Sequence, residues 1–240
     1  MTKREPLMSN DYFDGKIEYL EKSVRDRLRK LQDQPAIYTK PEVFLYANFR
    51  NSYQLIFLDY SRGGDIDGLK SKFGPIVSAW ERYLACPNSE VNDFSVIDHY
   101  VVSLWLLSFA LLFGIEAPLL DRLLECIGNE GKDPLFERLV AIRVTARPAA
   151  GNLLHPKPYE PLFKAIDASG DSRQALMAQF LKTWYKSLTN TYWYNCHKGP
   201  EGGGFFGYWS IEAAAVAKVF AIDDEAFREM PYYPKDLVRG

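Results

Sequence analysis

The sequence contains 240 residues, of which 47% are hydrophobic and 25% are charged. This length suits one large domain or two small ones, and the composition excludes disordered, collagen-like and low-complexity chains. The 29 basic and 31 acidic residues leave a net charge of -2. That balance excludes a general nucleic-acid binder, because such a protein needs an excess of Lys and Arg.

The cysteines and the N-terminus indicate the cellular compartment. Cys86, Cys126 and Cys196 are odd in number and lie far apart, so a disulfide framework is not expected. The first residues contain no apolar signal region. The longest apolar run, residues 100–115, is shorter than the roughly 20 residues of a spanning helix, and we interpret it as a buried core helix. We therefore expect a cytoplasmic protein without a membrane segment.

The apolar period of the first 60 residues is helical. Apolar side chains recur every three or four positions and predict one helix with an apolar face. These residues are Ile17, Leu20, Val24, Leu28 and Leu31. Pro41 suits the first turn of a second helix, which should run to about residue 60. The late part of the first helix carries basic residues that we interpret as a solvated face, namely Arg25, Arg27, Arg29 and Lys30.

Turn and cap residues begin the next stretch. Gly63 and Gly64 predict a turn, and Asp65 can cap the helix that follows. Residues 66–84 carry a further apolar stripe at helical spacing. The pair Gly74-Pro75 should kink or split that helix, since proline lacks a backbone N–H.

The rest of the chain alternates helices with irregular stretches. A helix should open at Ala117-Pro118, and another should run from Asp133-Pro134 to about residue 144. Residues 146–161 contain four prolines and a glycine and predict a long loop. The remaining elements are expected in this order: a helix over about 161–169, a helix over about 172–190, an aromatic and glycine-rich tract over 191–209, and a helix over 210–220.

These elements define the predicted fold class. The sequence shows no strand alternation, hairpin signal or repeat of fixed period. We predict an all-α protein, a compact multi-helix bundle of about nine or ten helices. We expect an N-terminal helical region over residues 1–90 and a C-terminal helical region over residues 91–240, packed together as one globular unit.

The sequence contains no strong catalytic motif. Adjacent Cys196 and His197 are interpreted as a loop pair, because neighbouring residues in a loop rarely face each other as nucleophile and base. His99, His155 and His197 lie on different segments, so we expect no metal site and no cofactor. The glycines of residues 199–204 precede a helix but follow no strand, and we interpret them as a mobile loop rather than a phosphate-binding turn.

Glu212 stands among apolar residues of the helix expected over 210–220. It could be a buried general base with a raised pKa, or a structural acid that accepts hydrogen bonds or pairs with an Arg. We favour the structural role, because no partner for catalysis is evident in the sequence.

The C-terminal residues carry a more specific pattern. Residues 207–215 read GYWSIEAAA, and Ile222-Asp223-Asp224 and Tyr233-Pro234-Lys235-Asp236 follow. This pattern resembles the closing signature of the PoNe immunity (PoNi) family of bacterial proteins. LDYSRGGDI at residues 58–66 is similar to the Tyr-Ser-x-Gly turn of that family, and LSFALLFGIEAPLLDRLL is similar to its middle. The resemblance spans most of the chain and departs from the family around residues 202–204.

The resemblance implies an all-α protein without catalytic activity. Members of that family bind a co-produced antibacterial DNase toxin of restriction-endonuclease-like type and block it. Such toxins serve interbacterial competition and travel through contact-dependent machinery such as type VI secretion. The expected partner is therefore a PoNe-like toxin met in the cytoplasm, with no direct nucleic-acid binding and no membrane. The resemblance leaves the oligomeric state open.

A protein that neutralises a DNase is expected to present carboxylates and aromatic anchors to a basic cleft. Candidate partner-binding residues are Asp65, Asp67, Tyr194, Glu201, Phe205, Phe206, Asp223 and Asp224. The same residues can be helix caps and core aromatics, so both interpretations stay open.

Family signature residues are expected to form the scaffold, because partner-specific surfaces must vary between cognate pairs. These residues are Gly207, Tyr208, Trp209, Glu212, Pro234 and Asp236. Two alternative functions remain: a small all-α hydrolase that uses Glu212 and His197, and a helical adaptor for another protein.

Overall fold

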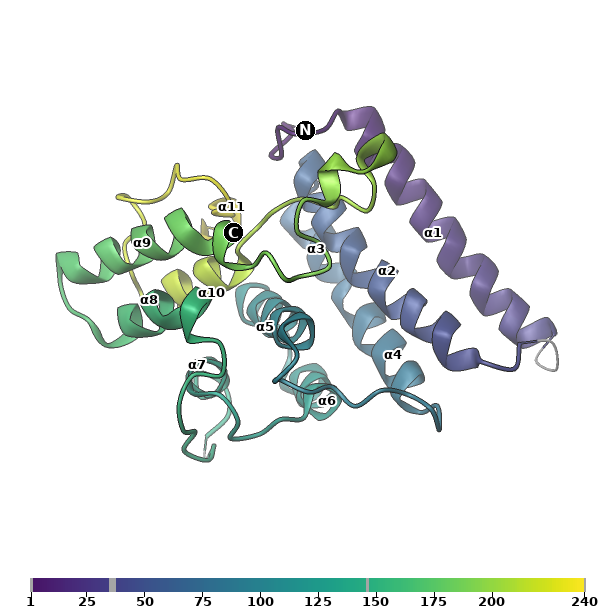
Figure 1. The fold of residues 1–240 in the computed structure, drawn as a ribbon, viewed down its shortest axis with the longest axis horizontal. Coiled ribbons are helices and arrows are strands. Elements are labelled where there is room, and N and C mark those ends of the chain that lie inside the picture. Colours follow the sequence, from purple (N-terminus) through teal and green to yellow (C-terminus); the bar gives the residue numbers. More distant parts are fainter. Residues whose placement is uncertain (1, 35–37, 146, 240) are drawn as a thin grey trace. The chain divides into compact units, whose positions relative to one another are not determined.

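The computed structural model describes residues 2–34, 38–145 and 147–239, and the regular elements in these ranges are all helices (Figure 1). The predicted all-α class is therefore confirmed. The α-helices are α1 (Asn10–Asp33), α2 (Pro41–Arg62), α3 (Ile66–Ser71), α4 (Phe73–Leu84), α5 (Ile97–Leu112), α6 (Ala117–Ile127), α7 (Pro134–Val140), α8 (Pro156–Asp167), α9 (Asp171–Ser187), α10 (Ile211–Val219) and α11 (Asp236–Arg239). Two short 3-10 turns, η1 (Cys196–Lys198) and η2 (Pro200–Gly202), precede α10.

The helices gather into two compact units. The N-terminal unit comprises Met1–Val91, Arg122–Cys126 and His197–Gly207. The C-terminal unit comprises Asn92–Asp121, Ile127–Cys196 and Tyr208–Gly240. The glycine-rich segment of residues 197–207 thus belongs to the same unit as α1 and α2, although it lies late in the sequence.

The core of the N-terminal unit lies between α1, α2 and α4. Phe13, Ile17 and Leu20 of α1 are buried, as the helical period predicts. Most side chains in the second half of α2 are buried as well. Trp80 of α4 stacks on Phe49 of α2, with ring centroids 4.6 Å apart. This stacked aromatic pair joins α2 to α4.

The break between α3 and α4 lies slightly earlier than predicted. Gly74-Pro75 was expected to kink or split the helix, but the chain changes helix at Lys72. Pro75 then lies in the first turn of α4, where its missing N–H leaves no intrahelical bond unmade. Proline acts here at a helix start rather than as a kink.

The core of the C-terminal unit includes most of α5. Nearly all side chains from residue 100 to residue 112 are buried, which confirms the predicted core helix. α10 packs against α5, and α8 packs against α9. Lys218 of α10 donates a hydrogen bond from Nζ to the carbonyl of Leu112 at the end of α5, over 3.2 Å.

Within the part of the chain that the structure describes, no helix is both long and apolar enough to cross a membrane.

The long loop predicted over residues 146–161 is wrong in its second half. α8 begins at Pro156 and contains Pro161, whereas the sequence pattern placed the helix start at Pro161. Prolines in a first helical turn cost little, and Tyr159 and Leu162 bury one face of α8. This packing offsets the single backbone hydrogen bond that Pro161 removes. Ala146, at the start of the predicted loop, lies outside the described residues.

Candidate partner-binding surface

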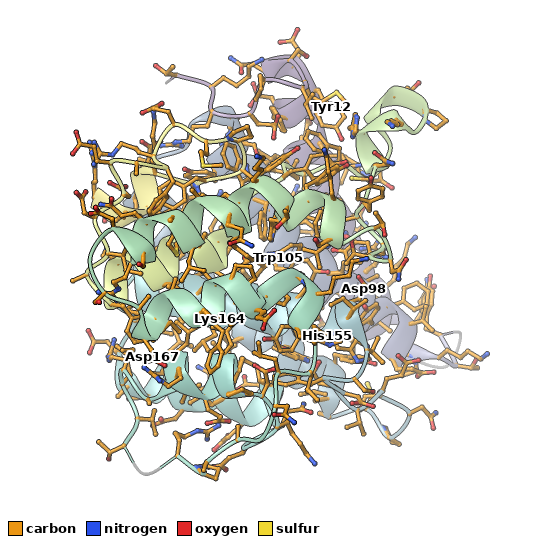
Figure 2. All side chains as sticks on the ribbon, turned by 60° about the vertical axis from the view of Figure 1, so that its left-hand side comes forward. Tyr12, Asp98, Trp105, His155, Lys164 and Asp167 are labelled. Carbon is orange, nitrogen blue, oxygen red and sulfur yellow. The ribbon has the colours of Figure 1, made fainter. Side chains whose placement is uncertain are left out.

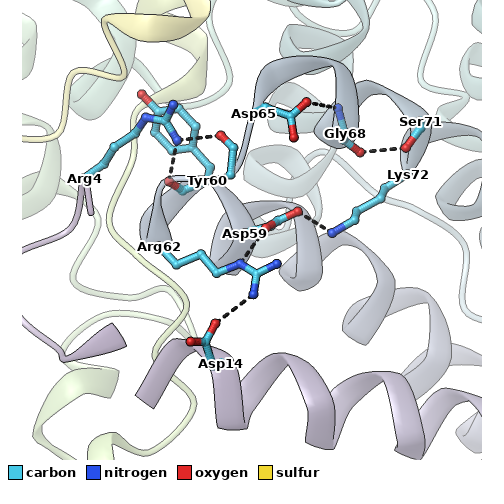
Figure 3. Close-up of polar contacts among 10 residues, drawn as sticks. Arg4, Asp14, Asp59, Tyr60, Arg62, Asp65, Gly68, Ser71 and Lys72 are labelled. Carbon is cyan, nitrogen blue, oxygen red and sulfur yellow. Dashed lines mark hydrogen bonds and ion pairs between the residues drawn. The ribbon is translucent and has the colours of Figure 1, made fainter. Parts of the chain in front are cut away.

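Asp65 and Asp67 lie at the start of α3 and are both exposed. Asp65 is the N-cap of α3, and its Oδ1 accepts a hydrogen bond from the backbone N–H of Gly68 over 2.7 Å (Figure 3). The predicted capping role of Asp65 is therefore confirmed. Its second carboxylate oxygen and the whole carboxylate of Asp67 are available to a partner.

A network of charged side chains lies beside this pair. Nε of Arg62 donates to Oδ1 of Asp59 over 2.7 Å, and NH1 of Arg62 donates to Asp14 of α1 over 2.7 Å (Figure 3). Lys72 also pairs with Asp59. Burial opposes ionisation of Asp59, but hydrogen bonds and charges from Lys72 and Arg62 outweigh it and lower the pKa of the carboxyl. The network joins α1, α2 and the junction between α3 and α4.

Arg4 holds the N-terminal segment on the end of α2. Its NH1 donates to the carbonyls of Tyr60 and Gly64, over 3.0 Å and 2.8 Å (Figure 3). Its guanidinium carbon lies 4.5 Å from the centroid of the Tyr60 ring. Backbone N–H groups of Arg4 and Glu5 both donate to the carbonyl of Ser61. This role of Arg4 could not be predicted from the sequence, because its partners lie about 60 residues away.

The glycine-rich segment is anchored on the N-terminal unit and is not the free loop that the sequence suggested. Oη of Tyr12 donates to the carbonyl of Phe205 over 2.7 Å, and Nζ of Lys16 donates to the carbonyl of Gly203 over 3.1 Å. Ser61 donates to the carbonyl of Phe206 over 3.1 Å. Figure 2 labels Tyr12 on α1. The segment therefore has a defined place against α1 and α2.

This anchoring corrects the expectation for two aromatic residues. Phe205 is fully buried and lies near the rings of Tyr12 and Phe13, and Phe206 packs edge-on against Phe57 at 5.3 Å. Buried side chains cannot be surface anchors for a partner without unfolding the segment. Phe205 and Phe206 are thus core residues, and our proposed surface does not include them.

Glu201 differs from its aromatic neighbours. Its side chain is exposed, and its backbone φ is +51°, which is uncommon for a residue with a side chain. The anchored segment therefore presents this carboxylate at the surface of the N-terminal unit, where a partner can reach it.

We expect Gly202→Ala to loosen the segment. Gly202 has a φ of +79°, and an added Cβ would lie 2.7 Å from Cε2 of Tyr12. The strain and the collision should lower the free energy of unfolding of the N-terminal unit by about 2 kcal/mol. Hydrogen exchange should also accelerate at residues 202–206. Gly204→Ala is the matched control, because its Cβ would meet no atom within 4 Å. If residues 202–206 exchange hydrogen equally slowly in both variants, the anchoring contacts do not stabilise the segment.

Asp223 and Asp224 are adjacent but have different roles. Asp223 is exposed, and its Oδ1 accepts from the backbone N–H of Glu225 over 3.1 Å. Asp224 is buried, accepts from Nε of Arg228 over 2.9 Å and lies 3.4 Å from Oη of Tyr233. Asp224 is therefore a structural acid and is removed from the candidate surface. Asp223 remains on it.

Tyr194 belongs to an aromatic cluster in the C-terminal unit. Its ring centroid lies 4.7 Å from that of Tyr185, which also stacks on Tyr232 at 5.3 Å. Oη of Tyr185 accepts from the backbone N–H of Asn195 over 3.1 Å. Tyr194 is half-buried, so part of its ring remains accessible.

Glu212 lies at the centre of the C-terminal unit. Its carboxylate is fully buried, and Oε1 accepts from Nε1 of Trp184 over 2.6 Å. Burial raises the pKa of Glu212 to about 7, although its own backbone amide, Trp184, Ser210 and Trp105 favour the charged form. Trp105, on α5, is labelled in Figure 2. A carboxylate without access to solvent suits a structural role and does not favour the hydrolase alternative.

Other signature residues also lie in the interior. The side chains of Tyr208, Trp209 and Pro234 are buried. Gly207 is buried and has a φ of +109°, a conformation that favours glycine. Asp236 is half-buried at the start of α11. These positions fit the proposed scaffold role.

The other residues with possible chemistry are dispersed. Sγ of Cys196 lies 3.6 Å from Oη of Tyr208, whereas the ring of His197 faces Phe205 at 6.0 Å. Nε2 of His155 lies 2.7 Å from the carbonyl of Phe94. Within the described ranges, no three His, Cys, Asp or Glu side chains gather as ligands for a metal ion.

Asp98 is a residue whose role the sequence did not reveal. It is half-buried in the first turn of α5, and its Oδ1 accepts from the backbone N–H of Tyr192 over 3.1 Å (Figure 2). Burial raises the pKa of Asp98, against the lowering effects of that N–H and of His99. Asp98 thus fixes the aromatic segment that contains Tyr194.

The chain was compared with known proteins and structures. The family model described as "PoNe immunity protein (PoNi), N-terminal" matches residues 4–125, and "PoNe immunity proteins (PoNi), C-terminal" matches residues 131–237. No curated protein matches the chain significantly. A crystal structure of protein PA2201 from Pseudomonas aeruginosa has a TM-score of 0.77 and 20% identity. The alignment covers 99% of this chain and 91% of that chain and shows a shared fold.

The two family models together account for nearly the whole chain and for all three segments that carry the resemblance: the Tyr60-Ser61 turn, the middle segment over residues 107–124 and the signature from Gly207 onward. The chain belongs to the PoNe immunity (PoNi) family.

Proposed function

We propose that this protein is an immunity protein that binds a PoNe-type DNase toxin directly and blocks it in the cytoplasm of the producing cell. Membership of the PoNi family is the observation that carries the proposal. Inhibition by binding needs no catalytic residue of its own. The buried Glu212 and the separate contacts of Cys196 and His197 agree with such a role.

The exposed carboxylates Asp65, Asp67, Glu201 and Asp223 supply the proposed contact groups. A DNase holds its substrate with basic residues, so carboxylates on an inhibitor accelerate encounter and align the partner. Asp65, Asp67 and Glu201 belong to the N-terminal unit, and Asp223 belongs to the C-terminal unit. Each unit therefore carries proposed contact groups of its own, and Tyr194 is a proposed aromatic contact on the C-terminal unit.

Coexpression tests the function in cells. Bacteria that express the toxin encoded beside this gene should stop growing, and coexpression of this protein should restore growth. Purified toxin and immunity protein should also coelute in size-exclusion chromatography. Growth arrest that persists despite abundant folded protein would contradict the proposal.

Charge removal tests the proposed surface while it keeps acceptors for the backbone N–H groups of Gly68 and Glu225. In the variant Asp65→Ser, Asp67→Asn, Glu201→Gln and Asp223→Ser, serine can still cap the backbone N–H groups that Asp65 and Asp223 bind. The association rate with the toxin at low salt should fall by about tenfold, because electrostatic steering is lost. Stopped-flow measurement at low and high salt checks this.

The control variant is Glu116→Gln with Asp121→Asn, which removes two exposed carboxylates elsewhere. It should associate at nearly the rate of the unmodified protein. If the association rate falls equally in both variants, steering depends on net charge and not on these positions. If it falls in neither variant, the four carboxylates are not part of the interface.

A further inference from the structure

The outer face of α1 is a continuous exposed surface. Residues spaced by three or four positions share one face of a helix, and this face bears both signs of charge. The exposed residues on it are Asp11, Asp14, Gly15, Glu18, Lys22, Arg25 and Arg29. Phe13, Ile17 and Leu20 lie on the opposite, buried face. Asp14, at one edge of the outer face, pairs with Arg62 of α2, and the rest of this face is separate from the surface that packs on α2.

The charges on α1 are segregated along its length. Residues 10–21 contain four acids and one base, and residues 22–33 contain two acids and five bases. The helix dipole favours such an order only within the first and last turns. The segregation here extends through the middle of a helix of 24 residues. The dipole therefore does not account for the whole pattern.

The outer face of α1 also carries an exposed glycine, Gly15, within the helix. Glycine destabilises a helix interior, and an added Cβ at Gly15 would meet no atom within 4 Å. Nothing in the chain itself therefore requires glycine at this exposed position. An exposed glycine does allow the backbone or a long side chain of a partner to approach the helix closely.

We propose that the outer face of α1 binds the same face of a second copy of this chain in an antiparallel arrangement. With the two-fold axis at the level of Leu20, Glu18 meets Lys22 of the other copy, and Asp11 meets Arg29. Arg25 then lies over Gly15, where no side chain blocks it. The acidic half of each helix faces the basic half of the other, except that Asp14 meets Asp26. Within each copy, Arg62 pairs with Asp14, and Lys22 and Arg29 pair with Asp26.

Charge complementarity selects a second copy over the toxin as the occupant. A basic DNase cleft would match the acidic half of α1 and repel Lys22, Arg25 and Arg29. A second copy matches both halves at once through a self-complementary contact. Lys22 and Arg29 already pair with Asp26 within the helix. These ion pairs are exposed and weak, so both basic side chains can turn to the acids of a second copy.

The expected dimer is weak and sensitive to salt. Exposed ion pairs contribute little each, and added salt screens them. Sedimentation velocity should show a monomer–dimer equilibrium at 50 mM NaCl. The association constant should be at least about tenfold smaller at 500 mM NaCl.

Charge-swapped variants test the register. Asp11→Lys with Glu18→Lys, and Lys22→Glu with Arg29→Glu, should each be monomeric alone, and an equimolar mixture should form a heterodimer. The chain with all four changes should dimerise again, because its faces are complementary once more. Gly15→Gln should weaken the dimer without unfolding α1, which circular dichroism can verify.

Three outcomes would overturn the proposal. The first is a protein that stays monomeric at all concentrations in low salt. The second is dimerisation that the paired charge reversals leave unchanged. A monomer in which Asp11→Lys with Glu18→Lys abolishes toxin binding would also overturn it and would reassign the face to the toxin. Neutralisation of the toxin is measured separately, so its success or failure does not decide this result.

Discussion

Replacing Glu212 with Gln should remove a pH dependence of about 3 kcal/mol from the stability of the C-terminal unit. The pKa of Glu212 is about 7 in the folded protein, against 4.5 for an unperturbed Glu. Below pH 4.5 both states hold the proton, and stability is highest. As pH rises toward 7 the unfolded chain ionises first, so stability is lost until the folded pKa is passed. Gln holds no titrating proton and can still accept from Trp184.

The measurement is the difference in free energy of unfolding between the unmodified protein and Glu212→Gln, from urea titrations at pH 4 to 8. Four of the five tryptophans lie in the C-terminal unit, so tryptophan fluorescence reports mainly on that unit. As pH rises from 4 to 8, the free energy of unfolding of the unmodified protein should fall relative to that of Glu212→Gln. A constant difference would show that Glu212 ionises normally in the folded state.

Glu81→Gln provides a control of opposite sign. Glu81 pairs with Arg122, and the hydrogen bond from that guanidinium lowers the pKa of the Glu81 carboxyl. The stabilisation by Glu81 should therefore be present above the unperturbed pKa and be lost as pH falls. Because the pair is largely exposed, this effect should be small.

Gly63→Ala should destabilise the N-terminal unit by about 3 kcal/mol or more. Gly63 has a φ of +104°, and an added Cβ would lie 2.4 Å from the backbone oxygen of Thr2. The N-terminal segment would have to move, which breaks the hydrogen bonds from Arg4 and Glu5 to Ser61. Urea unfolding and hydrogen exchange of residues 60–64 measure the loss.

Two comparisons separate collision from backbone strain. Gly114 also has a positive φ, +56°, but its Cβ would meet no atom within 4 Å. Gly114→Ala should therefore cost the C-terminal unit only about 1–2 kcal/mol. Deleting residues 1–5 should remove the collision, so Gly63→Ala should cost less in the shortened chain than in the full one. An equal cost in both chains would contradict the described packing.

Features set by nearby residues were predictable from the sequence. The cap at Asp65 and the helix start at Asp133-Pro134 could be predicted because the N–H groups that these aspartates bind lie only three residues ahead, and both bonds are present. The apolar run of residues 100–115 identified a core helix in the same way. The start of α8 was predicted too late because prolines usually interrupt helices. In α8, the packing of buried side chains outweighs the one backbone hydrogen bond that Pro161 removes.

Features set by distant contacts could not be predicted. Phe205 and Phe206 are aromatic residues beside glycines, a composition equally suited to a surface or a core. Their burial depends on Tyr12, Phe57 and Ser61, each more than 140 residues away, which hydrogen-bond to the segment or pack against its rings. The partner of Asp224 lay within four residues, but its burial depends on the surrounding fold.

Titration of a purified PoNe toxin with this protein tests the central claim most directly. DNA cleavage by a fixed amount of toxin should fall steadily and reach zero at about one equivalent of immunity protein, if binding is tight. A heat-denatured sample and the four-carboxylate variant serve as comparisons. Unchanged cleavage in a tenfold excess of folded protein, with no complex in size-exclusion chromatography, would contradict the account.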